Sequence, residues 1–438
     1  MSREMKDCGI PWIGDIPEGW RIMRLKEIAD VRRGGSPRPI DDYIADSGYN
    51  WIKIGDTVKG SKYITSVRQK IKPEGLSKTR QVFSGDLLLT NSMSFGEPYI
   101  LKVDGCIHDG WVAFSDIKNA EKEFLYYYLL SPFCKMQFDT QVAGGVVQNL
   151  NVDKIASTLI ELPPLPEQKS IADFLNKKCA EIDEMIALQE KIIEELKAYK
   201  QSVITEAVTK GLNPDVPMKD SFALDGAIIP NDWEERKFSQ ICSRITDFVA
   251  SGSFEDLRKN VKYLDTPDYA MLVRTTDLSN SAKSKGIVYV SEASYNFLKN
   301  SNLYGGEIVL PNVGSIGDVY IVPKDLYPKM TLAPNAITFS TTVVDKYYYY
   351  YFLSAYGNRQ LKDISESTAM PKFNKTDLRQ LRVICPPLSE QKDIAEYLDK
   401  KCSDIDSLIS TKNAKIEELK EYKKSIIYEY VTGKKEVN

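Results

Sequence analysis

The chain has 438 residues, 42% hydrophobic and 10% aromatic, which is enough for two to four domains with ordinary apolar cores. It carries a net charge of −3, has no apolar run as long as the roughly 18 residues of a membrane span, and begins without the apolar stretch of a secretory signal. The seven cysteines form no C-x-x-C pair and are odd in number, which argues against a disulfide framework or zinc site and favours a reducing cytoplasm.

Residues 1–160 are predicted to form a mixed α/β domain. Strand-like segments at 50–54 and 86–90 are separated by Gly, Asn and Pro turns, and residues 120–130 read as a helix. A net negative charge is unusual for a nucleic-acid-binding protein. Residues 51–80, however, hold eight basic residues against two acidic ones, with Trp51 and Tyr63 among them. This local excess predicts contacts with a phosphate backbone.

Other polar groups of this region are also suited to DNA. The sequence RRGGSPR at residues 32–38 predicts a basic loop whose glycines let phosphate approach backbone N–H groups. The turn at Asn91 and Ser92 offers an amide and a hydroxyl to base edges, in the way that asparagine reads adenine. The predicted DNA-binding residues here are Arg32, Arg33, Ser36, Arg38, Lys53, Lys59, Lys62, Arg68, Lys70, Lys72, Asn91 and Ser92.

Residues 161–212 are predicted to contain one long helix. The sequence PPLPEQ at Pro163 is a start signal, and after its prolines more than 40 residues follow without Pro or Gly before Gly211. Apolar residues recur at heptad spacing along two neighbouring lines, which widens the stripe beyond a simple two-stranded seam.

Residues 213–383 again read as mixed α/β. Strand-like segments lie at 286–290 and 307–310, and residues 345–353 are predicted to form a helix whose run of five tyrosines packs on all sides. The predicted DNA-binding residues of this region are Arg258, Lys262, Arg274, Lys283, Lys285, Asn312 and Ser315.

The final segment, residues 384–438, repeats the first long helix. The stretch from Pro163 to Thr209 returns without a gap from Pro386 to Thr432, and more than half of the aligned positions are identical. Fainter echoes precede each copy, such as IPEGW at Ile16 and IPNDW at Ile229. The chain is therefore an internal duplication, with one part of each half retained and the other diverged.

Two interpretations of the apolar stripe remain open. Each helix could lie along a globular domain, or the two copies could pair as an antiparallel coiled coil that keeps a second face for partners. The repeated length and the double stripe favour the pair. The residues predicted for the coiled coil or its partners are Leu175, Ile182, Ile186, Ile193, Leu196, Tyr199, Leu398, Ile405, Ile409, Ile416, Leu419 and Tyr422.

Motifs of catalysis are missing from the sequence. There is no Asp/Asn-Pro-Pro-aromatic motif or Gly-rich loop for S-adenosylmethionine, and no phosphate-binding loop of the G-x-x-x-x-G-K-[ST] type. The single histidine, His108, excludes most histidine-based metal sites and is predicted to be structural. The sequence thus predicts no catalytic residue, metal or cofactor of its own.

Two divergent regions, each followed by a PPL-x-EQ helix, resemble the specificity subunit of type I restriction–modification enzymes. The sequence IPEGW-x-x-x-x-L-x-x-I from Ile16, GGSP at Gly34 and WIKIGD at Trp51 fit the resemblance as well. The second region departs from it, with RTTD at Arg274 in place of IKIGD and no GGSP. The resemblance implies an α+β fold with a pseudo-twofold internal repeat. Two α/β target recognition domains (1–160 and 213–383) would be separated by two long antiparallel coiled-coil helices (161–212 and 384–438).

The resemblance also implies that each recognition domain reads one half of an asymmetric bipartite site in double-stranded DNA. The helices would space the domains and dock two methyltransferase subunits that bind S-adenosylmethionine. Motor-nuclease subunits would use ATP and Mg²⁺. The rival from another class is a free-standing DNA-binding regulator with a coiled-coil spacer. A third hypothesis, a purely structural coiled-coil protein, conflicts with the two large globular regions.

Overall fold

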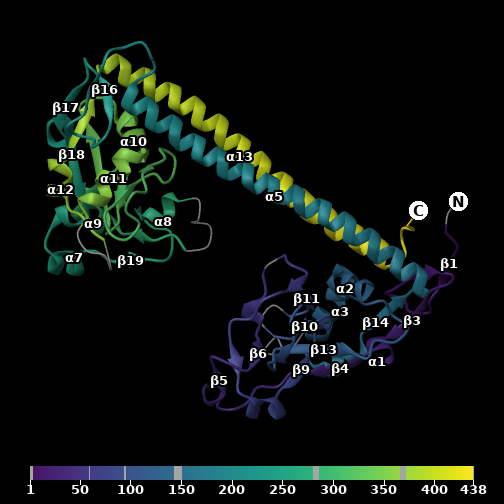
Figure 1. Cartoon of the computed structure of the whole chain (residues 1–438). Coiled ribbons are helices and arrows are strands. Elements are labelled where there is room, and N and C mark those ends of the chain that lie inside the picture. The colour runs from purple at the N-terminus through teal and green to yellow at the C-terminus, as the bar shows by residue number, and fades with distance from the viewer. Residues whose placement is uncertain are drawn as a thin grey trace. The chain divides into compact units, whose positions relative to one another are not determined.

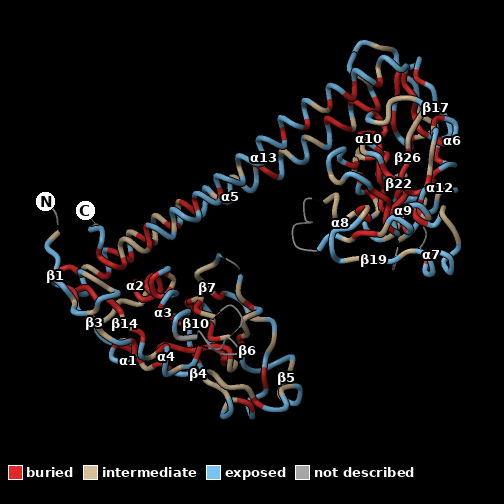
Figure 2. Tube along the Cα trace, turned by 180° about the vertical axis from the view of Figure 1, so that it is seen from behind, coloured by how far each residue is buried: buried red, intermediate tan, exposed pale blue. Residues whose placement is uncertain are grey.

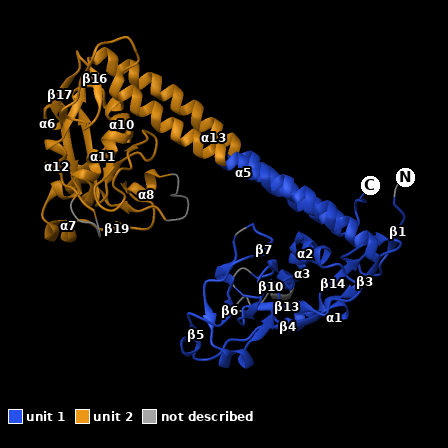
Figure 3. Ribbon diagram, in the orientation of Figure 1, with its two compact units in different colours: residues 1–190, 413–438 blue, residues 191–412 orange. Residues whose placement is uncertain are grey.

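The computed structural model describes residues 3–58, 60–92, 95–142, 150–279, 286–365 and 371–437 (Figure 1). The chain divides into two compact units, residues 1–190 with 413–438 and residues 191–412 (Figure 3). The two long helices, α5 (Leu165–Lys210) and α13 (Leu388–Val431), each contribute to both units. The predicted segments follow the order of the chain, whereas each compact unit combines a globular domain with parts of both helices.

Two five-stranded sheets form the globular part of the first unit, in the orders β4-β13-β10-β11-β7 and β5-β8-β6-β12-β9. The pairs β11–β7 and β12–β6 are parallel, and the other pairs of these sheets are antiparallel. The strands are β4 (Asp30–Arg33), β5 (Ile44–Ala45), β6 (Tyr49–Ile52), β7 (Tyr63–Ile64), β8 (Lys70–Ile71), β9 (Arg80–Val82), β10 (Leu87–Thr90), β11 (Pro98–Leu101), β12 (Gly105–Ile107) and β13 (Trp111–Ser115).

The core of this unit lies between these strands and a helix that is apolar on all sides. Helix α2 (Lys122–Leu130) buries six consecutive residues from Phe124 to Leu129, and they share a cluster with Leu87 and Phe114 of the first sheet. The remaining helical segments are α1 (Leu25–Ile28), η1 (Ile40–Asp42), η2 (Ile54–Asp56), η3 (Pro73–Lys78), α3 (Pro132–Val142) and α4 (Val152–Ser157).

The second unit also contains two sheets, with the orders β18-β26-β23-β24 and β19-β21-β20-β25-β22. The strands are β18 (Cys242–Asp247), β19 (Tyr263–Leu264), β20 (Ala270–Val273), β21 (Tyr289–Val290), β22 (Asn302–Leu303), β23 (Ile308–Pro311), β24 (Tyr320–Ile321), β25 (Met330–Leu332) and β26 (Ala336–Thr341). The parallel pair is β20–β25, which corresponds to β6–β12 of the first unit.

The tyrosine run of the second unit forms helix α10 (Asp345–Leu353), as predicted. Tyr347, Tyr348, Tyr350 and Tyr351 are buried, and their hydroxyls bond to protein acceptors. None of these rings is available to stack on a base. The other helical segments are α6 (Phe238–Ile241), η4 (Phe248–Ser251), α7 (Phe254–Asn260), α8 (Thr275–Leu278), α9 (Glu292–Phe297), η6 (Lys299–Ser301), α11 (Ala355–Asp363) and α12 (Lys375–Gln380).

Each domain is closed by a strand that returns to its beginning. β14 (Leu159–Leu162) pairs with β3 (Arg21–Arg24), and β27 (Arg382–Cys385) pairs with β17 (Glu234–Lys237), both antiparallel. A hairpin precedes each pair, formed by β1 (Met5–Asp7) with β2 (Asp15–Pro17), and by β15 (Met218–Asp220) with β16 (Ile228–Pro230). The returning strand leads directly into the Pro-Pro sequence, which places the start of each long helix beside the first strands of its domain.

The retained sequence at the start of each long helix bonds to its own domain. Trp20 Nε1–H donates to Glu167 Oε2 at 3.0 Å, and Trp233 Nε1–H donates to Glu390 Oε2 at the same distance. Both tryptophans are almost fully buried. The neighbouring glutamine makes the same bond in both copies. Gln168 Nε2 donates to the Pro163 carbonyl, and Gln391 Nε2 donates to the Pro386 carbonyl, each at 2.8 Å. These bonds give a physical reason for the repeated EQ pair.

Both long helices end at glycines. Gly211 and Gly433 have φ of 75° and 69°, left-handed values that glycine adopts without strain and that commonly end helices. A Cβ on Gly433 would also lie 2.4 Å from Pro17 Cγ and 3.2 Å from the Trp20 ring. The end of α13 therefore packs closely on the first domain, beside the start of α5.

Helices α5 and α13 pack together as an antiparallel pair, so the paired interpretation of the stripe is confirmed (Figure 2). In the first unit Leu175, Ile182 and Leu419 are buried in one cluster, and in the second Val203 and Leu398 share another. Ile193, Ile405 and Ile416 are buried, while Ile186, Leu196 and Ile409 are half-buried. Tyr199 and Tyr422 lie outside the seam, 53% and 55% exposed.

The predicted strands are present with shifted ends. The segment 50–54 is β6 followed by a 3-10 turn, and only Tyr289–Val290 of the predicted 286–290 is a strand. Trp51, which lies within the basic stretch of the sequence, is buried beside Ile71 and Cys106. It therefore belongs to the core and not to a DNA-facing surface.

Candidate nucleic-acid interface

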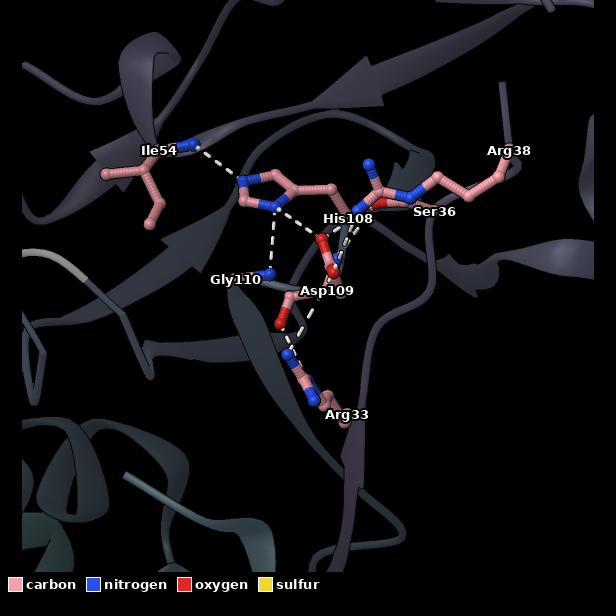
Figure 4. A network of polar contacts seen from close by, with 7 residues as sticks. All are labelled: Arg33, Ser36, Arg38, Ile54, His108, Asp109 and Gly110. Atoms are coloured by element: carbon pink, nitrogen blue, oxygen red, sulfur yellow. Dashed lines mark hydrogen bonds and ion pairs between the residues drawn. The ribbon is translucent and has the colours of Figure 1, made fainter. Parts of the chain in front are cut away.

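Two arginines and a serine of the first domain converge on Asp109, in the turn between β12 and β13 (Figure 4). Ser36 Oγ donates to Asp109 Oδ1 at 2.8 Å, and Arg33 Nε donates to the Asp109 carbonyl at 2.7 Å. Arg38 Nη2 lies 3.5 Å from Asp109 Oδ2. The Arg33 and Arg38 side chains remain 52% and 74% exposed. One carboxylate thus orients two guanidiniums and leaves a net positive charge toward solvent, which suits phosphate binding.

The charge state of Asp109 supports this arrangement. Burial by itself raises the pKa of its carboxyl group. The Ser36 hydroxyl and the Arg33 guanidinium lower the pKa by more than burial raises it, so the pKa lies below its ordinary value. The carboxylate is therefore ionised at neutral pH, and the ion pairs with Arg33 and Arg38 persist there.

His108 holds the same turn in place. Backbone N–H groups face both of its nitrogens, from Gly110 to Nδ1 at 2.8 Å and from Ile54 to Nε2 at 3.2 Å. A neutral imidazole has one acceptor nitrogen, and the shorter bond favours Nδ1. Burial lowers the pKa of His108, which keeps the ring neutral. His108 thus has the structural role that the sequence predicted.

Asn91 lies beside this turn, but its side chain does not face solvent. Its N–H donates to the Gly110 carbonyl at 3.0 Å, and its own carbonyl accepts from Leu150 at 3.0 Å. The residue is 4% exposed. Its side-chain Oδ1 is buried without a hydrogen-bond partner among the described residues, so the amide does not reach the surface where a base edge would meet it. Ser92 is half-buried, and its hydroxyl lies against Gly110.

The two glycines of the RRGGSPR loop do not present free N–H groups. Gly34 donates to the Trp111 carbonyl at 2.9 Å and Gly35 to the Ile107 carbonyl at 3.2 Å. A Cβ on Gly34 would lie 2.1 Å from the His108 carbonyl oxygen, and one on Gly35 would lie 2.6 Å from that of Lys78. The prediction of a phosphate-binding backbone is wrong here. The glycines allow close packing of the chain, and the arginine side chains remain the groups that reach solvent.

The remaining basic residues of the first domain differ in whether their side chains already bond to protein groups. Arg68 and Lys70 are exposed. Lys53 Nζ donates to Gln69 Oε1 at 2.6 Å, and Lys72 Nζ donates to the Asp42 carbonyl at 2.8 Å. Arg32 pairs with Asp30 at 2.7 Å. Lys59 lies outside the described residues.

Lys62 was predicted to bind DNA, but its ammonium group points into the first unit. It forms an ion pair with Glu123, donates to Asn176 Oδ1 at 2.6 Å, and lies 4.7 Å from the ring centroids of Tyr126 and Tyr127. Its side chain is 13% exposed. Burial lowers the pKa of Lys62 to about 8. A charge held in this way fixes the sheet to α2 and α5 and does not meet phosphate.

In the second domain, two predicted residues that are far apart in sequence line one cavity. Arg258 of α7 and Asn312, at the end of β23, both border a space of about 670 Å³. Asn312 corresponds to Asn91, since its N–H donates to the carbonyl of Asn335 in the equivalent turn, at 3.1 Å. Its side-chain amide donates to the Phe373 carbonyl at 2.9 Å. The structure thus brings Arg258 and Asn312 together.

Arg274 was also predicted to bind DNA, but its side chain is held within its own turn. Its guanidinium bonds to both carboxylate oxygens of Asp277, at 2.6 and 2.9 Å, and to the Gly286 carbonyl at 2.8 Å. Its backbone N–H also donates to Asp277, as that of Lys53 does to Asp56. RTTD therefore occupies the structural position of IKIGD, and its arginine stabilises the turn. Lys262 and Ser315 are exposed, and Lys283 and Lys285 lie outside the described residues.

Several important residues were missed at the level of sequence. Asp109 was overlooked because nothing in its spacing links it to Arg33 and Ser36, more than 70 positions away. The bonds of Trp20 and Trp233 could have been anticipated, because IPEGW and IPNDW recur with PPL-x-EQ in both halves. A long-range pairing of two repeated motifs is the signal that was available.

Two features are absent from the described residues. These residues contain no group of three or more His, Cys, Asp and Glu side chains that could hold a metal ion. None of their helices combines the length and apolar character needed to cross a membrane.

Comparison with known proteins follows the internal repeat. Residues 17–198 and 230–420 each match the model of the type I restriction modification DNA specificity domain. The MjaX type I restriction enzyme specificity subunit of Methanocaldococcus jannaschii is 28% identical over 444 residues, covering 96% of this chain and 95% of that protein. The EcoBI specificity subunit of Escherichia coli is 23% identical over 446 residues, covering 99% and 90%.

The fold has a counterpart among solved structures. A chain from a study of complex assembly and conformational transition of the type I R-M system aligns with a TM-score of 0.73. The alignment has 17% sequence identity and covers 95% of this chain and 99% of the other. Because the two matched segments span most of the sequence, the chain belongs to the family of type I restriction modification DNA specificity proteins and contains two copies of the family's domain.

Proposed function

We propose that the protein is the specificity subunit of a type I restriction–modification complex, and that each domain reads one half of a bipartite, asymmetric DNA site. The proposal rests on one observation: the two domains are attached to the long helices in the same way, but their turns differ in sequence. Both units join a domain to the long helices through the same Trp–Glu bond. The turns that follow β12 and β25 differ, with His-Asp-Gly in one and Ala-Pro-Asn in the other. Two different readers on similar supports suit an asymmetric site.

In this proposal the charged residues position the protein on the phosphate backbone. The first domain would use Arg33 and Arg38 beside Asp109, together with exposed Arg68 and Lys70. The second would use Arg258 and Lys262. Sequence discrimination would come from the turns and cavity between these cations, because phosphate contacts fix orientation and carry no sequence information directly.

The long helices would hold the readers and dock two methyltransferase subunits. Large apolar side chains stay exposed at equivalent positions of the two repeats. In the first unit these are Met185, 43% exposed, and Tyr422. In the second they are Leu408, 50% exposed, and Tyr199. Matched apolar positions outside the seam would let two identical partners bind in the same way.

The chemistry would belong to the partners. The methyltransferase subunits would bind S-adenosylmethionine and methylate adenine, and motor-nuclease subunits would use ATP and Mg²⁺. The isolated chain should therefore neither methylate nor cut DNA, and methylation should appear when the modification subunit is added.

The test combines reconstitution with a domain exchange. The chain is co-expressed with a type I modification subunit, and methylated adenines are mapped across the genome. We expect one bipartite motif. Replacing residues 1–160 by those of another family member should change one half of that motif and leave the other. Methylation by the chain alone would contradict the proposal, as would simultaneous change of both halves. Specific DNA binding that never leads to methylation would favour the free-standing regulator.

A further inference from the structure

The cavity of the second domain has the size of a small-molecule site. Its volume of about 670 Å³ lies within the roughly 300–1,000 Å³ that is usual for such sites. Phe248, Leu257, Val261 and Phe373 contribute apolar side chains to its lining. All of its lining residues belong to the second unit.

One residue of the lining, Ala336, holds the position that Trp111 holds in the first domain. Trp111 begins β13 and pairs with Thr90 of β10, and Ala336 begins β26 and pairs with Pro311 of β23. The two residues therefore hold equivalent positions in equivalent sheets. Trp111 is completely buried, whereas Ala336 lines the cavity. The first domain thus has a buried indole ring at a position where the second domain has only a methyl group, beside its cavity.

Two aromatic side chains among the lining residues are open to solvent. Phe254, the first residue of α7, is 83% exposed, and Tyr263 of β19 is 56% exposed. An exposed phenylalanine gains nothing from the domain's own core, but it offers a flat face on which a planar ring can stack.

The free charge at the cavity is positive. Arg258 and Lys372 line it and form no ion pair within the described part of the chain. Of the two carboxylates of the lining, Asp247 is paired with Lys375 Nζ at 2.6 Å, whereas Asp377 accepts the Asn374 N–H at 2.8 Å and keeps its charge, so among the described residues two unpaired cations face one unpaired carboxylate. A ligand that brings a phosphate would meet unpaired cations.

The cavity lining also includes an exposed side-chain amide, that of Asn335. Asn335 follows Pro334 in the turn between β25 and β26 and holds a left-handed φ of 68°. It is exposed and lines the cavity. The side chain of asparagine donates and accepts at once, which matches the edge of a nucleobase, adenine above all.

We propose that this cavity binds one nucleotide, with its base stacked on Phe254 and Tyr263 and its phosphate held by Arg258 and Lys372. The inference rests on the proposed function and deepens it. The two domains would read DNA differently, the first by polar groups on a filled surface and the second by enclosing a base. Such a base can come from the second half-site, turned out of the duplex, or from a free nucleotide.

The experiment uses the full chain assembled with its modification subunit. Duplexes carry the mapped site with a single mismatch at each position of the second half-site in turn. A mismatch normally weakens binding, but opposite a base that leaves the stack it removes the unpairing cost and tightens binding. We expect one position where a mismatch raises affinity about tenfold, and we expect Phe254→Ala to abolish that gain. The adenine that is methylated can show a gain as well, but one that does not depend on Phe254.

Free nucleotides form the second arm. Each of the four deoxynucleoside monophosphates is titrated by calorimetry into the same complex, where a free-nucleotide site would bind at least one of them and lose about tenfold in affinity with Phe254→Ala. The matched control is Phe222→Ala, since Phe222 is 90% exposed in the same unit but does not line the cavity. It should leave both measurements unchanged.

The two arms identify the source of the base. A Phe254-dependent mismatch gain assigns the site to DNA, and Phe254-dependent binding of a monophosphate assigns it to a free nucleotide. If neither depends on Phe254 while the complex still methylates its bipartite motif, the cavity proposal is wrong and the proposed function stands. If the wild-type complex methylates no bipartite motif, the proposed function itself has failed.

Discussion

Lys200 Nζ lies 2.7 Å from both carboxylate oxygens of Asp406, which joins α5 to α13 within the second unit. Within the first unit, the equivalent residues of the two repeats form the reciprocal pair, Lys423 with Asp183, also at 2.7 Å. Each repeat thus supplies the lysine of one bridge and the aspartate of the other. This reciprocity is the signature of an antiparallel pair with internal twofold symmetry.

Reversing the two lysines should weaken the helix pair. Lys200→Glu with Lys423→Glu places like charges together, and we expect a loss of about 1–2 kcal/mol in unfolding free energy, since each partly exposed pair contributes at most about 1 kcal/mol. Adding Asp406→Lys and Asp183→Lys should restore the stability. Denaturant unfolding followed by circular dichroism at low salt measures both, and the difference should shrink at 1 M NaCl. A quadruple variant no more stable than the double would contradict the pairing.

The exposed basic residues of the first domain should set part of the salt dependence of DNA binding. Replacing Arg68, Lys70 and Lys72 by Ala should reduce the slope of log K against log salt by roughly two to three units, because each lost phosphate contact removes about 0.9 of a counterion. Lys62→Ala is the contrast. It should leave the slope unchanged but lower the melting temperature, because it leaves the largely buried Glu123 carboxylate without its lysine partner. An unaltered slope in the triple variant would place this surface away from DNA.

A buried glutamate should make the first unit sensitive to pH. Burial raises the pKa of Glu161 to about 7, and Tyr128 is its hydrogen-bond donor at 3.4 Å. Because this folded pKa exceeds the roughly 4.3 of an unfolded glutamate, its contribution to stability is present at low pH and is lost as pH rises through 7. Glu161→Gln should therefore match the wild type near pH 4 and exceed it at pH 8, by on the order of 2–3 kcal/mol. Thermal unfolding across this range measures the difference, and an equal effect at both ends would contradict it.

The long helices are expected to set the distance between half-sites. Inserting one heptad after Glu190 and one after Asn413, which are equivalent positions, keeps the stripe in register and adds roughly 10 Å to each helix. At 3.4 Å per base pair this corresponds to about three base pairs, but it also rotates the second half-site by around a quarter turn. The spacer should grow by one to three base pairs while both half-sites keep their sequence. Mapping of methylated adenines measures it, and an unaltered spacer with full activity would show that the helices dock partners without setting distance.

The sequence by itself determined the duplication, the two long helices and the mixed α/β character of the domains. These follow from local patterns, because heptad spacing, Pro-Pro starts and glycine ends act over a few residues. The DNA-binding roles that it suggested for Arg33, Ser36, Arg38, Arg258 and Asn312 stay predictions. The tyrosine run was assigned correctly because five adjacent aromatic residues on a helix can only be packed on all sides.

Only the tertiary structure decided which polar residues are free. Lys62 lies in a stretch with the composition of a DNA-binding surface, but Glu123, brought close by the fold, pairs with it, and Arg274 is paired with Asp277 only three positions away. Gly34, Gly35 and Asn91 likewise bond through their backbones to segments distant in sequence. Whether the Lys62 ammonium meets solvent depends on neighbours from helices α2 and α5 that arrive through the fold, and a linear pattern does not contain those neighbours. The same holds for the cavity, because its lining comes from separate segments between Asp247 and Asp377 that only the fold brings together.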